Sequence, residues 1–292
     1  MDRSLDEDQL LNAWIAVLRE ITRKDRPLPG IYLEYRVNKR PLDVVVIHKR
    51  YSVSWLCELK KSGVDLDQAA KILQIDKDTL IRYGSLRDGD DYWFMFVLGD
   101  KDRLPPALER LREINHQSRF GLTGLELTRN VISVSSAGDD FEPKSLREVM
   151  INTSFTYRRR IPLLIDESVV NSKKATEKSR NLDFWLLNGA LKTIFHSEDG
   201  IVNWSRVHTE LFRNLSWFSY SSVVEKALME RFKRLMKYFT DKEYLKYRSD
   251  SKDWSIENFD GLVKALNSKS SWIKKLAEKG SEPQLPLFDP FE

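Results

Sequence analysis

The stretch Leu42–Lys60, LDVVVIHKRYSVSWLCELK, decides the fold of this 292-residue chain. Two runs rich in Val, Ile and Trp flank a polar segment at residues 49–51, which is the pattern of two β-strands joined by a turn. A turn centred just after Arg50 makes the numbers of paired residues add up to 101, so that Asp43 faces Glu58. Directly opposed residues have β-carbons about 4.5–5.5 Å apart. The sequence therefore predicts two neighbouring carboxylates at one end of a hairpin.

Lys60 adds an amine to this pair. Side chains alternate along a strand, so Glu58 and Lys60 point to the same face. Two adjacent carboxylates repel each other, and a divalent cation removes that repulsion. Mg²⁺ prefers hard oxygen ligands and keeps water molecules that a substrate can displace. We therefore expect Asp43, Glu58 and the backbone carbonyl of Leu59 to bind Mg²⁺, for which Mn²⁺ can substitute.

Such a cluster suits phosphodiester hydrolysis, because a metal ion lowers the pKa of its bound water and polarises the phosphoryl oxygen. We expect Lys60 to orient or deprotonate that water, or to steady the charge that grows on the phosphate. The alternative is an inert salt bridge between Lys60 and one of the two acids.

Hydrophobic periodicity places the hairpin in a larger domain. Helical spacing predicts helices over residues 5–24, 65–83 and 105–116, and β-rich runs predict strands over 31–37, 42–48, 52–60 and 92–98, with two more within 121–136. The order α-β-β-β-α-β-α-β predicts an α/β domain over residues 1–150, with a central sheet flanked by helices. A transition segment over 151–180 precedes a mainly α-helical domain over 181–280.

This order and these residues resemble the PD-(D/E)xK nuclease superfamily, whose core is the αβββαβ fold of the restriction endonucleases. Asp43 takes the position of the motif's aspartate, and Glu58-Leu59-Lys60 takes that of its (D/E)xK. The sequence departs from the literal motif in one place, because Leu42 separates Pro41 from Asp43. The resemblance implies a metal-dependent endodeoxyribonuclease.

The same resemblance suggests helper residues and partners. Members often carry a further acid on the first helix or first strand, and Glu20 and Glu34 are the candidates; the alternative is that both are ordinary surface residues. The RecB-like branch adds a glutamine on the next helix, where Gln68 stands, although Ile72 replaces that branch's tyrosine. Many members need two active sites to cut both strands, which implies a homodimer or an accessory nuclease or ATPase.

Basic residues are concentrated in the second half of the chain. Residues 1–150 hold 24 Lys and Arg against 25 Asp and Glu, whereas residues 151–282 hold 24 against 17. Such an excess can neutralise backbone phosphates, although a solvated helical surface is the alternative. A helix-turn-helix is one possibility around Val202–Leu235, with no recognition helix singled out. The candidate nucleic-acid-binding residues are Arg158, Arg159, Arg160, Lys226, Arg231, Lys233, Arg234 and Lys237.

The last residues, 281–292, predict a flexible tail with a docking peptide. Gln284-Leu285-Pro286-Leu287-Phe288 resembles the bacterial sliding-clamp-binding peptide QL(S/D)LF and departs from it at Pro286. Leu287 and Phe288 are apolar anchors that suit a partner's groove, and Gln284 and Leu285 complete the match. The resemblance implies recruitment to a sliding clamp; the alternative is a tail that docks on its own helical domain.

Composition restricts the remaining function classes. The single cysteine, Cys57, excludes an internal disulfide framework and a cysteine-based zinc site. No apolar run reaches the length of a membrane span, so we expect a cytoplasmic protein with no membrane partner. The runner-up to a Mg²⁺-dependent DNA endonuclease is a non-catalytic DNA-binding or adaptor protein with a degenerate nuclease fold.

Overall fold

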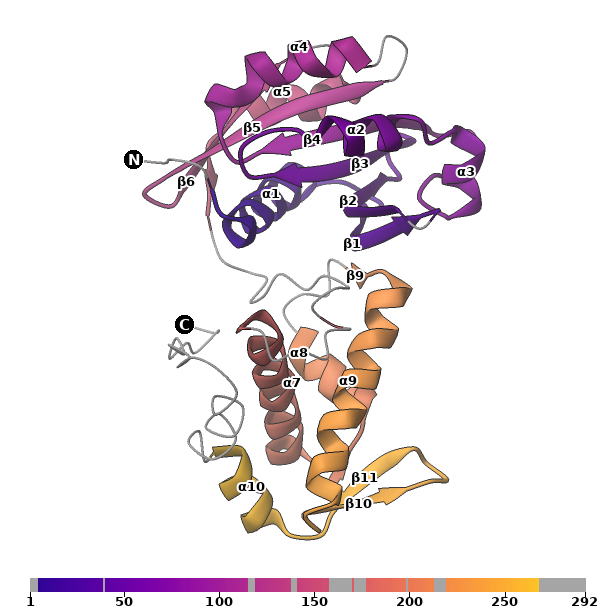
Figure 1. Ribbon diagram of the computed structural model, residues 1–292, viewed down its shortest axis with the longest axis vertical. Coiled ribbons are helices and arrows are strands. Elements are labelled where there is room, and N and C mark those ends of the chain that lie inside the picture. The colour runs from indigo at the N-terminus through magenta and orange to yellow at the C-terminus, as the bar shows by residue number, and fades with distance from the viewer. Residues whose placement is uncertain are drawn as a thin grey trace. The chain divides into compact units, whose positions relative to one another are not determined.

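The computed structural model describes residues 5–38, 40–114, 119–137, 141–157, 170, 177–197, 199–212 and 219–267. The chain divides into two compact units, whose elements are labelled in Figure 1. Unit 1 comprises Met1–Leu164 together with Trp217–Ser221, and unit 2 comprises Ile165–Ser216 together with Ser222–Glu292.

Unit 1 is built on one eight-stranded mixed sheet. The strand order is β7-β6-β5-β4-β3-β2-β1-β9. Strands β1, β2 and β3 pair antiparallel, β3, β4 and β5 pair parallel, and β9 runs parallel to β1. The strands are β1 (Gly30–Val37), β2 (Arg40–His48), β3 (Val53–Lys60), β4 (Asp91–Leu98), β5 (Phe120–Thr128), β6 (Val131–Ala137), β7 (Phe155–Thr156) and β9 (Ser219–Tyr220). The predicted α/β domain with a large central sheet is confirmed.

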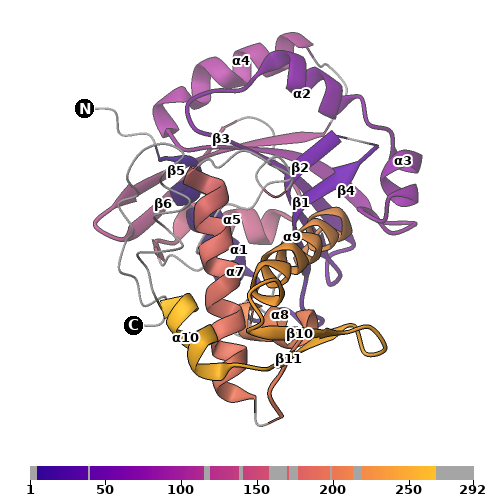
Figure 2. The ribbon, with the colours of Figure 1, turned by 60° about the horizontal axis from the view of Figure 1, so that its bottom comes forward.

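Helices cover both faces of this sheet (Figures 1 and 2). On one face, β-strand side chains and residues of α2 and α4 form a single buried apolar cluster. On the other face, Trp14 of α1 stacks on Trp55 of β3, with ring centroids 6.5 Å apart. The helices are α1 (Glu7–Ile21), α2 (Leu66–Leu73), α3 (Lys77–Arg82), α4 (Leu104–Ile114) and α5 (Lys144–Asn152), with a 3-10 turn η1 at Lys101–Arg103.

Two expectations for unit 1 were wrong. The single helix predicted over residues 65–83 is two helices, because the Asp76 side chain accepts a hydrogen bond from the Thr79 amide at 2.7 Å and caps a new helix. Ile75 is buried between the two helices, so apolar periodicity runs through the break and hides it. The sequence also indicates a loop over residues 138–145, whereas helix α5 begins within that stretch, directly after Pro143.

Unit 2 combines helices with a small three-stranded sheet. The helices are α7 (Glu177–His196), α8 (Trp204–Phe212), α9 (Ser222–Thr240) and α10 (Phe259–Asn267). The strands β8 (Ile201–Val202), β10 (Leu245–Arg248) and β11 (Asp253–Ile256) pair antiparallel in the order β10-β11-β8. The sequence predicted a mainly α-helical domain over residues 181–280 and did not predict these short strands. Helix α8 and the larger part of α9 fall within Val202–Leu235, the interval in which a helix-turn-helix was one possibility.

A buried ion pair helps to hold unit 2 together. Arg231 of α9 donates two hydrogen bonds to the Asp183 carboxylate of α7, at 2.5 and 2.9 Å, and a third to the carbonyl of Val170 at 3.2 Å. The planar guanidinium fits a carboxylate through two parallel bonds, which fixes the angle between the two helices as well as their distance.

Among the helices that the structure describes, none is both long enough and apolar enough to span a bilayer.

Candidate active site

The hairpin that carries the predicted site has the expected register. Strands β2 and β3 pair from Val44 with Cys57 to His48 with Val53, and every pair of residue numbers adds up to 101. Asp43 and Glu58 lie one step beyond the last of these pairs. There the amide of Leu59 donates to Oδ2 of Asp43 at 2.6 Å, so a side chain takes the place of a strand-to-strand bond. This bond fixes the Asp43 carboxylate beside β3.

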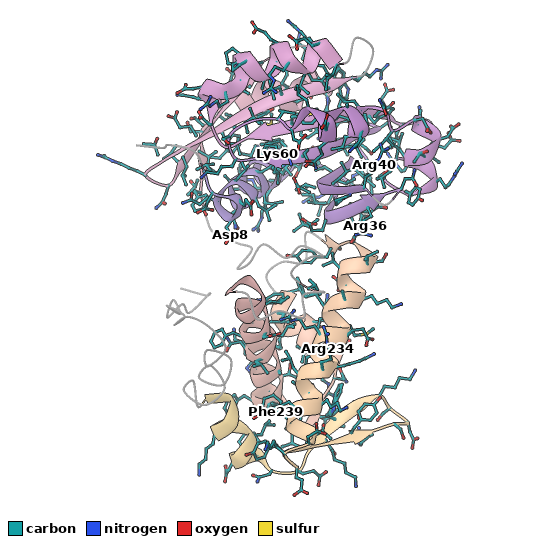
Figure 3. The ribbon with its side chains drawn as sticks, in the orientation of Figure 1. Asp8, Arg36, Arg40, Lys60, Arg234 and Phe239 are labelled. Carbon is teal, nitrogen blue, oxygen red and sulfur yellow. The ribbon has the colours of Figure 1, made fainter. Side chains whose placement is uncertain are left out.

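Glu58, Lys60 and Gln68 form a hydrogen-bonded network. The Lys60 ammonium lies 2.8 Å from Oε1 of Glu58 and donates to Oε1 of Gln68 at 2.7 Å. The Gln68 amide in turn donates to Oε1 of Glu58. Figure 3 labels Lys60 in unit 1, with Arg36 and Arg40 of the neighbouring strands. The structure thus brings together Glu58, Lys60 and the predicted helper Gln68 through contacts between β3 and α2.

Helix α2 is placed for this contact by its own sequence. Asp65 caps the helix, because its side chain accepts a hydrogen bond from the Gln68 amide at 3.1 Å. Ala69 and Ile72 are buried in the core cluster on the same helix. Capping and burial together set the rotation of α2, which directs Gln68 toward the end of β3.

The electrostatics of the two acids show that they lie close together. Burial, and after it the charge of Glu58, raises the pKa of Asp43 to about 7, although the Leu59 amide and Lys60 oppose the shift. Burial also raises the pKa of Glu58, against the lowering effect of Lys60 and Gln68. Both carboxyl groups are therefore costly to ionise in the folded protein. A cation that binds both carboxylates would lower that cost.

Glu58 retains an oxygen suited to such a cation. Its side chain is 4% exposed, and its Oε2 is buried with no hydrogen-bond partner among the described residues. A buried carboxylate oxygen without a partner is costly. Mg²⁺ is commonly bound by one or two carboxylates and completes its shell with water and substrate phosphate. The donor set of Asp43 and Glu58 therefore fits Mg²⁺, although no group of three or more His, Cys, Asp or Glu in the described part of the chain is arranged to hold a metal.

The two candidate helper acids lie in different places. Glu34 occupies the register position opposite Asp43 in the β1–β2 pairing, but its φ of +50° interrupts the ladder there. Glu20 lies at the C-terminal end of α1, where it is exposed and forms an ion pair with Arg23 at 3.3 Å. The helix acid whose charge acts on Asp43 is instead Glu7, in the first turn of α1. The only sequence signal for Glu7 is its place in the acidic run Asp6–Asp8.

The candidate nucleic-acid-binding residues separate into two groups. Lys226, Lys233, Arg234 and Lys237 are exposed on α9. Arg231 is 6% exposed and forms an ion pair with Asp183. It lies on the buried face of α9, unlike the four exposed basic residues. Its assignment to nucleic-acid binding does not fit this position. Arg158, Arg159 and Arg160 and the tail residues Gln284, Leu285, Leu287 and Phe288 lie outside the described residues.

Two further reactive side chains in the described part of unit 1, Cys57 and His48, are buried. Cys57 lies in the core, and burial raises the pKa of its thiol far above its ordinary range. His48 packs edge-on against Trp55, with ring centroids 4.4 Å apart, and burial lowers its pKa to about 3. Both groups stay uncharged near pH 7, so neither competes with the Asp43 cluster as a nucleophile or base.

Comparison with known proteins adds no relative: no family model matches this chain, and neither does any curated protein or solved structure.

Proposed function

We propose that the chain is a Mg²⁺-dependent DNA endonuclease with a PD-(D/E)xK-type site in unit 1. The observation that carries the proposal is the hairpin register, which sets Asp43 beside the end of β3 with Glu58 and Lys60 in contact there. The site offers two buried carboxylates, with Glu58 disfavouring the charged form of Asp43, and one ammonium within reach. These are groups that phosphodiester hydrolysis by a bound metal can use.

Each residue has a distinct role in this proposal. Asp43 and Glu58 hold Mg²⁺, with the carbonyl of Leu59 as a further ligand, and the bound ion supplies Lewis acidity and an acidified water. Lys60 contacts the attacking water or the phosphate and stabilises the charge that develops there. Gln68 holds Lys60 and Glu58 in one arrangement through its amide, which makes it a positioning residue.

The test is cleavage of duplex, single-stranded and branched DNA by the purified full-length chain with Mg²⁺, Mn²⁺ or EDTA. We expect metal-dependent cleavage that falls at least about a hundredfold in Asp43→Asn, Glu58→Gln and Lys60→Ala. The matched controls are Asp91→Asn and Lys101→Ala, which remove the same charges from surface ion pairs. Cleavage that persists in Asp43→Asn and Lys60→Ala together would reject the proposal.

One observation favours the runner-up, a non-catalytic protein with a degenerate nuclease fold. Lys60 already neutralises Glu58 across 2.8 Å, as an inert salt bridge would. Calorimetric titration with Mg²⁺ separates the two functions. A nuclease site binds the ion and loses that binding in Asp43→Asn, whereas a degenerate site shows no Mg²⁺ binding and no cleavage with any DNA form.

We also propose that the tail recruits the protein to a sliding clamp, with Gln284, Leu285, Leu287 and Phe288 as the contact residues. A tether of this kind raises the local concentration of the enzyme on DNA. Deletion of residues 283–292 is expected to abolish co-elution with a purified bacterial clamp while DNA cleavage without a clamp stays unchanged. Equal clamp binding by the deletion and full-length proteins would show that residues 283–292 are not the contact with the clamp.

Cleavage of both strands would require a second active site, so we propose a homodimer or an accessory nuclease or ATPase as a further partner. Light scattering during cleavage of a duplex distinguishes these, because a homodimer forms without any added protein.

A further inference from the structure

Helix α9 has one apolar face and one basic face. Apart from Arg231, which pairs with Asp183, its buried face consists of Val224, Leu228, Phe232, Leu235, Met236 and Phe239. Its exposed charged residues are four basic side chains and one acidic one, namely Lys226, Lys233, Arg234, Lys237 and Glu230. Figure 3 labels Arg234 on this helix. The basic stripe from Lys226 to Lys237 extends over roughly 17 Å at 1.5 Å per residue.

The composition of the stripe indicates the kind of partner. Glu230 is partly neutralised by Lys233, whose ammonium lies 2.8 Å away. Val223, at the start of the helix, is the one large hydrophobic residue of α9 with an exposed side chain. Protein interfaces place an apolar patch at their centre and are poor in lysine. A stripe of lysine and arginine without that patch suits a polyanion instead.

The β10–β11 hairpin, residues 245–256, follows the helix and holds three basic residues against two acidic ones, Asp250 and Asp253. Strand β10 packs against α9, and Figure 1 shows the β10–β11 hairpin extending from the C-terminal end of that helix. Lys246, Tyr247 and Lys252 are exposed on the hairpin. Arg248 is held by two hydrogen bonds to Asp253, at 2.7 and 2.9 Å, which tie the two strands together at the turn.

We propose that unit 2 binds duplex DNA with α9 in the major groove and the β10–β11 hairpin on the adjoining backbone. An α-helix with its side chains is about 10–12 Å across, and the major groove of B-DNA is about 12 Å wide. In helix-turn-helix proteins the second helix of a pair enters the groove, and α9 is the helix that follows α8 along the chain, after residues 213–221. Lys226, Lys233, Arg234 and Lys237 contact phosphates and base edges, and Lys246 and Lys252 contact phosphates.

The site rests on observations separate from those on Asp43, so it is tested without cleavage. The full-length chain carrying Asp43→Asn binds a labelled 30-base-pair duplex in an anisotropy titration over a series of salt concentrations. The test variant adds Lys226→Ala, Lys233→Ala and Lys237→Ala. The control adds Lys49→Ala, Lys77→Ala and Lys264→Ala, which removes three exposed charges elsewhere.

We expect the test variant to lose at least about tenfold in affinity near 0.15 M salt. Its plot of log affinity against log salt should become less steep, by about 0.9 for each lost phosphate contact. The control should match the Asp43→Asn parent. Duplex RNA should bind weakly, because its deep, narrow major groove does not admit a helix. If the triple variant has a lowered Tm, the single variant Lys237→Ala takes its place. Its slope of log affinity against log salt should be less steep by about one.

Two results would overturn the proposal. The first is equal affinity and slope in the parent and the test variant, and the second is equal binding of duplex RNA and duplex DNA. If the natural protein cleaves no DNA form but its α9-dependent binding is intact, only this proposal stands. If the natural protein cleaves DNA but its affinity is unchanged by the α9 substitutions, only the nuclease proposal stands.

Discussion

Asp43 is the residue whose charge state should most visibly follow pH. Its raised pKa, about 7, means that the folded protein holds a proton that the unfolded chain has released. Its contribution to stability is therefore present below the ordinary aspartate pKa and is lost as the pH rises through about 7. In the metal-free protein we expect Asp43→Asn to stabilise the fold at pH 8 by on the order of 1 kcal/mol, and by little at pH 4.

Thermal unfolding at the two pH values, with and without Mg²⁺, measures this effect. A gain of 1 kcal/mol corresponds to a rise in Tm of about 2–4 °C for a domain of this size. Mg²⁺ should raise the Tm of the natural protein at pH 8 and leave that of Asp43→Asn unchanged. If Asp43→Asn were less stable than the natural protein at pH 8, the charged form of Asp43 would not be disfavoured by burial and by Glu58.

His48 should make the protein acid-sensitive. Burial lowers its pKa to about 3, and neither ring nitrogen has a hydrogen-bond partner in the described part of the chain. Below pH 6.5 the unfolded chain takes up a proton that the folded form excludes, so stability falls as pH falls. We expect a loss of about 2 kcal/mol between pH 6.5 and 5 from this group.

The variant His48→Phe should remove that part of the pH dependence, since an apolar ring replaces the histidine. Denaturant unfolding at pH 5, 6 and 7 checks the slope. His196→Gln is the control because its side chain is 60% exposed. An unchanged slope in His48→Phe would show that the histidine is protonated in the folded protein.

Arg231 and Asp183 should be a structural pair in unit 2. Removing one partner leaves the other buried and unpaired, which costs about 3–5 kcal/mol. We expect Asp183→Leu and Arg231→Met each to destabilise the fold strongly, and the double variant Arg231→Met with Asp183→Leu to recover much of the loss. Calorimetry of the three variants tests this, and additive losses would show that the two side chains do not act as a pair.

At the scale of elements, helix α2 connects local sequence to the candidate site. Asp65→Ala removes the cap and should destabilise the helix by about 1 kcal/mol, whereas Asp65→Asn keeps an equally good cap. Because α2 carries Gln68, we expect Asp65→Ala to lower kcat about ten- to a hundredfold at an unchanged metal requirement. Cleavage rates of Asp65→Ala and Asp65→Asn test this. Equal rates would show that the helix cap does not affect cleavage at the site.

The sequence predicted elements well where pattern and packing agree. The β2–β3 register followed from turn chemistry and alternation, because a shift by one residue would expose the buried face of both strands. The break between α2 and α3 was missed because Ile75 continues the apolar pattern across it. The β10–β11 hairpin was missed because its strands have four residues each, too few for alternation to stand out beside long helices.

Side-chain placement at the site was only partly predictable. Glu58 and Lys60 were predicted to share one face of a strand, and they are in contact. Gln68 was suggested only by the family resemblance, and its contacts with both residues are a finding of the structure. Glu7 and the inward rotation of Arg231 depend on how helices pack on a sheet or on each other, and a single sequence carries no direct signal for that. The positive φ of Glu34 likewise arises from local backbone geometry rather than from residue type.

At the scale of the whole molecule, the two units are interleaved along the chain. Strand β9, which pairs with Tyr32 and Leu33 of β1, belongs to unit 1 but lies between α8 and α9 of unit 2. A chain that ends at residue 164 lacks this strand and leaves one side of β1 bare. We expect such a fragment to self-associate, because an unpaired edge strand pairs with other chains. Light scattering of the fragment beside the full-length protein tests this, and a stable monomer would contradict it.

The late arrival of β9 also has a consequence during synthesis. The ribosome makes about 180 residues between the end of β1 and the start of β9, which takes roughly 10 to 40 s at usual translation speeds. Strands β2 to β7 are made during that interval, so the nascent sheet lacks only β9 once residue 156 has been made. Newly made copies on the same message should therefore be most prone to misassembly before residue 220 emerges, and a chaperone that shields β1 would have its greatest effect in that window.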